Sequence, residues 1–184
     1  EQDHQYAQLY MPAAANLLKN AGFEETQGVA AANWRAYGKG GYVLDPQVKH
    51  GGPQALRATG NDAGAVQAVV LNQTVAQPLV LRGWSKHEKP GGGAEQVMTI
   101  GQTEQAPTPS AARSSDYALY VDLHYVGGGA LYGQAATFDR NATGWQFAEK
   151  VIHVSKPVKD ATLYLLHRSQ PGTIEELRPA VPPD

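Results

Sequence analysis

Three polar side chains alternate with apolar ones near the middle of this chain of 184 residues. Tyr120, Asp122 and His124 stand at every second position of residues 117–125. A phenol, a carboxylate and an imidazole in a row can stack on a ring and hydrogen-bond its rim. Asp122 and His124 could also act as acid and base, but no third group is placed to complete a catalytic set. We therefore expect these side chains to hydrogen-bond a ligand.

Two further stretches, residues 79–86 and 162–168, carry aromatic and charged side chains at alternate positions. Sugar recognition needs a flat apolar plate for the C–H face of a pyranose and polar groups for its hydroxyls. If all three stretches belong to one sheet, its outer side forms a single ligand-binding face with Trp84 as the main plate. The ligand-binding residues expected on this face are Arg82, Trp84, Lys86, Tyr120, Asp122, His124, Tyr164 and Arg168.

The same residues allow other arrangements. The strands could be turned the other way, or Trp84 and Tyr164 could form a small second core beneath residues 87–116. Asp122 could also pair with Arg82 or Lys86 on a neighbouring strand. Such exposed ion pairs contribute only about 0–1 kcal/mol to stability.

The spacing of apolar residues predicts the elements that carry these groups. Apolar side chains fall on every second position from Tyr117 to Tyr125, a period typical of a half-buried β-strand. Glycines 127–129 follow, where a hairpin turn needs residues that adopt positive φ. Residues 87–116 are rich in glycine and proline and predict a long surface loop. An edge strand that ends in a turn is expected at residues 16–24, and the other strands at 42–44, 54–59, 65–73, 78–86, 145–154 and 161–168.

Aromatic residues outside these stretches are expected to be structural. Trp34, Tyr37 and Tyr42 surround the glycine-rich residues 38–41. They are expected to anchor this loop, with a second binding edge as the alternative. Trp145 is assigned to the core.

The composition favours one all-β domain. The 20 glycines and 12 prolines suit many short strands and turns, and a hydrophobic fraction of 42% is sufficient for a core. We expect a β-sandwich jelly roll of two antiparallel sheets with little helix. The expected organisation is an N-terminal lead-in at 1–15, the domain at 16–177 and a Pro-rich tail or linker at 178–184.

Charge and residue usage argue against several functions. A net charge of −2 gives no electrostatic support for a nucleic-acid partner. No run approaches the roughly 20 apolar residues of a membrane span. The chain has no cysteine, and its six histidines lack the spacing of a zinc site. The carboxylates of Asp122, Asp139 and Glu149 could serve a glycosidase, but nothing in the sequence pairs them.

Ordered blocks of sequence resemble a known group of sugar-binding domains. Residues 16–24, Asn-Leu-Leu-Lys-Asn-Ala-Gly-Phe-Glu, resemble the opening of galactose-binding-like carbohydrate-binding modules, the group of families four, nine, sixteen and twenty-two. The later blocks that keep the order of the group are residues 52–57, 69–73, 81–86, 117–125, 144–146 and 156–166. The resemblance covers roughly residues 16–177. The resemblance implies a jelly roll that binds glycans without catalysing a reaction and usually holds a structural calcium ion.

The calcium site implied by the resemblance joins the two ends of the domain. Glu24, Glu175 and Glu176 would supply carboxylates, and backbone carbonyls around residues 49–51 would complete the oxygen shell. Where the group often ends in an aromatic residue and two aspartates, this chain reads Gly-Thr-Ile-Glu-Glu-Leu at 172–177. The alternative is that these glutamates are unrelated surface acids.

These observations lead to one main expectation of function. The chain is expected to be a non-catalytic carbohydrate-binding module that is secreted, extracellular or attached to the cell surface. Its partners would be a polysaccharide or oligosaccharide and a covalently linked catalytic domain of a polysaccharide-degrading protein. One alternative is a structural jelly-roll domain that packs on a catalytic domain without binding sugar. Another is a small polysaccharide lyase or glycoside hydrolase on the same fold.

Overall fold

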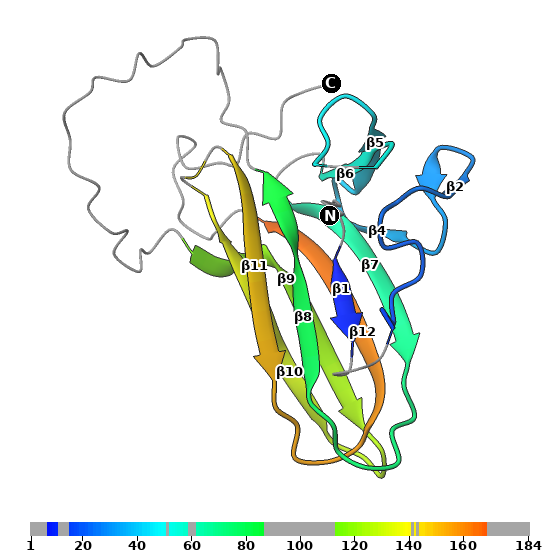
Figure 1. Ribbon diagram of the computed structural model, residues 1–184, viewed down its shortest axis with the longest axis vertical. Coiled ribbons are helices and arrows are strands. Elements are labelled where there is room, and N and C mark those ends of the chain that lie inside the picture. The colour runs from blue at the N-terminus through cyan, green and yellow to red at the C-terminus, as the bar shows by residue number, and fades with distance from the viewer. Residues whose placement is uncertain are drawn as a thin grey trace, which may run out of the picture.

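A computed structural model describes residues 7–10, 15–50, 52–58, 62–86, 113–140, 142 and 144–168. All regular elements in this part of the chain are β-strands, as Figure 1 shows. The prediction of an all-β protein with little helix is therefore confirmed for the described residues. None of them forms a helix of the length and hydrophobicity that a membrane span requires.

Two antiparallel sheets contain most of the strands. The larger sheet has five strands, in the order β10 (Ala130–Asp139), β9 (Arg113–Tyr125), β12 (Val158–Arg168), β7 (Asp62–Val70) and β4 (Arg35–Gly38). The smaller sheet has three, in the order β1 (Gln8–Tyr10), β8 (Leu79–Lys86) and β11 (Trp145–Ile152). Two short pairs complete the fold: β2 (Thr26–Gln27) with β3 (Ala30–Ala31), and β5 (Tyr42–Asp45) with β6 (Ala55–Ala58).

The two larger sheets enclose one apolar core. In Figure 1 the strands of the smaller sheet cross in front of β9, β10 and β12. Leu81 and Ile152 from the smaller sheet and Val121 and Leu163 from the larger sheet belong to the same buried cluster. Burial of each such side chain contributes roughly 1.5–3 kcal/mol to the free energy of folding. This core is therefore the main stabilising contact between the sheets.

Strand β9 shows the predicted alternation. Leu119, Val121 and Leu123 are buried, while Tyr120 and the side chains at 122 and 124 remain partly or fully exposed on the opposite side. The predicted turn follows, with φ angles of 80°, 101° and 89° at the three glycines 127–129. The half-buried strand and its glycine hairpin are therefore confirmed.

The edge strand expected within residues 16–24 is wrong, whereas the turn expected at its end is present at residues 19–22. The side chain of Asn16 accepts the backbone N–H groups of Leu9 and Leu18, and Gln67 on β7 accepts the N–H of Lys19. Asn20 and Phe23, further along, have φ angles of 48° and 60°, which a strand does not allow. These residues form a turn that is tied to the sheets by side-chain hydrogen bonds. The strand β1 lies in the expected lead-in and pairs with β8.

Candidate functional site

The eight residues expected on one ligand-binding face are divided between the two larger sheets. Arg82, Trp84 and Lys86 lie on β8, which pairs with β1 and β11 in the smaller sheet. The other five lie on β9 and β12, which are direct neighbours in the larger sheet. The expectation of a single face is therefore wrong, because β8 belongs to the sheet on the other side of the core.

Three tyrosines from three strands lie in a row on the outer side of the larger sheet. Tyr120 of β9 stands directly opposite Tyr164 of β12, with ring centroids 5.8 Å apart and planes at 74°. Tyr37 of β4 meets Tyr164 from the other side, at 5.4 Å and 79°. Strand β7 runs between β12 and β4, and Gly64, the partner of Tyr37 on β7, has no side chain to separate the rings. We call Tyr37, Tyr164 and Tyr120 the tyrosine row.

A carboxylate stands beside one end of the tyrosine row. Asp122 Oδ1 accepts the backbone N–H of Gly133 at 3.0 Å. Gly133 lies at an irregularity in the pairing of β9 with β10 and has a φ of 74°. A Cβ atom at Gly133 would be 3.7 Å from the hydroxyl of Tyr120, so the β10 backbone passes close to this phenol. The backbone of β10 thus fixes Asp122 next to the row.

The phenols of Tyr120 and Tyr164 keep their protons at neutral pH. Burial raises the pKa of Tyr120, and the charge of Asp122 and a hydrogen bond to it raise this pKa further. Burial likewise raises the pKa of Tyr164, with the charge of Asp122 as the next cause. Tyr120 and Tyr164 therefore offer hydroxyl groups, and Asp122 offers acceptor oxygens, on one partly exposed surface.

Two of the predicted side chains on this face have carboxylate partners. His124 Nδ1 lies 2.6 Å from Asp160 Oδ1, on the neighbouring strand β12. Arg168 Nη2 lies 2.9 Å from Asp116 Oδ1. These contacts orient the imidazole and the guanidinium on the sheet surface. The pairing of Asp122 with Arg82 or Lys86 is excluded by the topology, and Arg82 lies 3.9 Å from Glu149 instead.

Trp84 lies in an aromatic cluster on the outer side of the smaller sheet. The imidazole of His50 stacks on its indole, with centroids 4.1 Å apart and planes at 21°. Trp145 meets His50 at 5.2 Å, and Phe147, which is 47% exposed, meets Trp84 at 5.3 Å. His50 therefore covers one face of the Trp84 ring. The core assignment of Trp145 is wrong, since it is half-buried and stands opposite Lys86 on the outer side.

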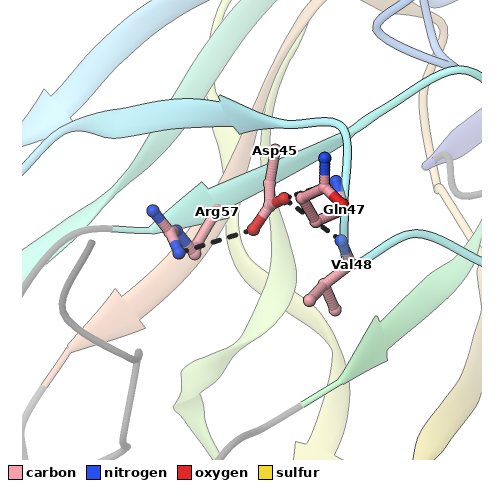
Figure 2. Close-up of polar contacts among 4 residues, drawn as sticks. All are labelled: Asp45, Gln47, Val48 and Arg57. Atoms are coloured by element: carbon pink, nitrogen blue, oxygen red, sulfur yellow. Dashed lines mark hydrogen bonds and ion pairs between the residues drawn. The ribbon is translucent and has the colours of Figure 1, made fainter.

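The loop that carries His50 is fixed by a buried carboxylate. Figure 2 shows Asp45 at the end of β5, where it accepts the backbone N–H groups of Gln47 at 2.7 Å and Val48 at 3.1 Å. Its other oxygen lies 3.4 Å from Arg57 Nη1 on β6. Because hydrogen bonds to a buried charge are strong, Asp45 holds the start of the loop that brings His50 over Trp84.

Sequence reasoning missed the contribution of β4 to the tyrosine row. Trp34 and Tyr42 do anchor the local loops: the Trp34 indole donates to Asn20 O at 2.9 Å, and the Tyr42 hydroxyl accepts the N–H of Ala31 at 3.1 Å. Tyr37 instead joins the outer face, together with the exposed Arg35 on the same strand. A strand of four residues is too short to show a period of two, so no signal in the sequence assigned it to this sheet.

The structure describes only one of the three expected metal ligands. Glu24 is exposed, and its Oε1 atom would lie 3.6 Å from a Cβ atom at Gly52. Glu175 and Glu176 lie outside the described residues. Within the described ranges, no group of three or more His, Cys, Asp or Glu side chains is arranged to hold a metal ion.

Comparison with known proteins gives no family for this chain: no protein-family model matches its sequence, and no curated protein is significantly similar to it. Function is therefore inferred from the two outer faces. The face of the larger sheet combines partly exposed rings with hydroxyl and carboxylate groups.

Proposed function

We propose that this protein is a non-catalytic carbohydrate-binding module that binds a polysaccharide or oligosaccharide on the outer face of its larger sheet. The observation that carries the proposal is the tyrosine row with Asp122 beside it. Aromatic side chains stack against the C–H faces of sugars, and neutral phenols and a carboxylate complement sugar hydroxyls.

The chemistry of this face favours binding over catalysis. A glycosidase needs two carboxyl groups about 5–10 Å apart on either side of the scissile bond. Of the three acids considered from the sequence, Asp122 and Glu149 lie on the outer faces of different sheets. Asp160, the next carboxylate along the face, is held by His124. Asp122 is thus positioned to accept hydroxyl hydrogens from a bound sugar.

We further propose that the two larger sheets form a jelly-roll sandwich of the galactose-binding-like kind, as the sequence resemblance implies. The five-stranded and three-stranded antiparallel sheets on a shared core support this architecture. A structural calcium ion bound through Glu24, a secreted or cell-surface location and a linked catalytic domain belong to the same proposal. The position of Glu24 beside residue 52 supports the calcium site.

The proposed face is tested by substitutions in the tyrosine row. Tyr164 lies at its centre, so Tyr164→Ala is expected to lower the affinity for the best ligand of a glycan array by about tenfold or more. Tyr164→Phe keeps the ring and loses one hydrogen bond, so a loss of about threefold is expected. Affinities are measured by calorimetry, after folding has been checked by circular dichroism.

A matched control is Phe147→Ala, because Phe147 is 47% exposed on β11, in the smaller sheet. The glycan affinity of this variant is expected to equal that of the unchanged protein. If Tyr164→Ala binds glycan as well as Phe147→Ala does, the tyrosine row is not the binding face. Release of reducing ends or unsaturated products by the protein alone would contradict a non-catalytic function.

A further inference from the structure

An exposed guanidinium lies at the β4 end of the tyrosine row. Arg35 pairs with Val66 on β7, and Val66 pairs with Tyr164 on β12, so Arg35 belongs to the same cross-strand line as Tyr164. Alternation on β4 places Arg35 on the same side of the sheet as Tyr37. Among the described residues, no hydrogen bond, ion pair or ring contact involves its side chain. A guanidinium with five donors is thus available beside the row.

The opposite end of the row carries the opposite charge. Asp122 accepts the N–H of Gly133 and has no ion-pair partner within the part of the chain that the structure describes. Two other carboxylates on this face each have a basic side chain within hydrogen-bonding distance, Asp160 with His124 and Asp116 with Arg168. Both Arg35 and Asp122 act electrostatically on the Tyr164 phenol, since Arg35 lowers its pKa and Asp122 raises it. The row therefore runs from a cationic end to an anionic end.

We propose that the ligand is an acidic glycan, whose carboxylate or sulfate is bound by Arg35 while an uncharged sugar unit stacks on Tyr164 and Tyr120. The inference rests on the proposed function and names the class of glycan. Arginine matches the planar, bidentate geometry of carboxylates and sulfate-like anions. Asp122 repels a second anion at its own end, so the charged and uncharged units take fixed places.

Matched pairs of oligosaccharides test this assignment. The probes are xylo-oligosaccharides with and without glucuronic acid branches, and galactan oligosaccharides with and without sulfate. Calorimetry at low salt is expected to show that the charged member of one pair binds about fivefold more tightly than its neutral match. The pair that shows the preference identifies the anion. This preference is expected to weaken as salt is added, since Arg35 is exposed.

Two variants assign the preference to Arg35. Arg35→Gln is expected to bring the ratio of charged to neutral affinity to about one while the neutral affinity is kept. Lys39→Gln removes the same charge from the exposed turn after β4 and is expected to keep the wild-type ratio. A wild-type preference for the neutral members, or a charge preference that survives Arg35→Gln, would overturn the inference and leave glycan binding intact. If no glycan binds at all, the proposed function itself fails.

Discussion

Ionisation of the buried Tyr117 phenol makes the folded protein less stable at alkaline pH. Its side chain is buried between the sheets, and its hydroxyl lies 2.7 Å from the Ser85 Oγ atom. Burial raises the pKa of Tyr117 from 10.0 to about 12, against smaller lowering effects of Ser85 and Arg140. Below pH 10 the proton is bound in both the folded and the unfolded chain. Between pH 10 and about 12 only the folded chain keeps it, so this stabilisation is lost as the pH rises.

We therefore predict that the alkaline loss of stability is smaller in Tyr117→Phe than in the unchanged protein. From about pH 9 to about pH 11.5, the free energy of unfolding is expected to fall by about 2 kcal/mol more in the unchanged protein. Urea denaturation at each pH gives this difference, and Tyr132→Phe, at an exposed site, is the control. Parallel pH profiles for the unchanged protein and Tyr117→Phe would show that the buried phenol does not resist ionisation.

Among the elements, the contact between β7 and β12 depends on a residue without a side chain. Gly64 has a φ of 138°, and a Cβ atom there would lie 1.8 Å from the Leu165 carbonyl oxygen. Gly64→Ala is therefore expected to lower the free energy of unfolding by about 3 kcal/mol or more, because β7 must move away from β12. Urea denaturation measures the change. Glycan affinity is expected to fall as well, since Gly64 is the partner of Tyr37.

A comparison with Gly28→Ala separates the effect of the steric clash at Gly64 from the effect of a positive φ angle. Gly28 has a φ of 65°, but no atom lies within 4 Å of the added Cβ. A loss of only about 1 kcal/mol is expected there. Equal losses in the two variants would mean that the sheet accepts a side chain at Gly64 without a rearrangement of β7.

The elements also show how far the sequence alone could predict this fold. A period of two reports which residues share one side of a strand, and on β8 and β9 it did so correctly. Strand neighbours depend on contacts between distant segments, so the pattern could not place β8 and β9 in different sheets. The segment at 16–24 contains apolar residues and was assigned to an edge strand that ends in a turn. Its conformation is set by side-chain hydrogen bonds from Asn16 and Gln67, which periodicity does not reveal.

At the scale of the whole molecule, the core separates two outer faces that carry different side chains. The sequence predicted the aromatic and charged character of both faces but merged them into one, because β8, β9 and β12 carry similar alternating patterns. The structure places Trp84 under His50 on the smaller sheet and Tyr164 in the tyrosine row on the larger sheet. The two residues are therefore expected to affect different properties.

Trp84→Ala is predicted to lower stability and to leave glycan affinity unchanged. The substitution removes the ring contacts to His50 and Phe147, so a loss of about 2 kcal/mol in the free energy of unfolding is expected for this half-buried side chain. The affinity for the best glycan should stay within about twofold of the wild-type value, because Trp84 lies on the opposite sheet from Tyr164. Tyr164→Ala should show the reverse pattern, with weak binding and a smaller stability change. A folded Trp84→Ala variant that no longer binds glycan would move the binding face to the smaller sheet.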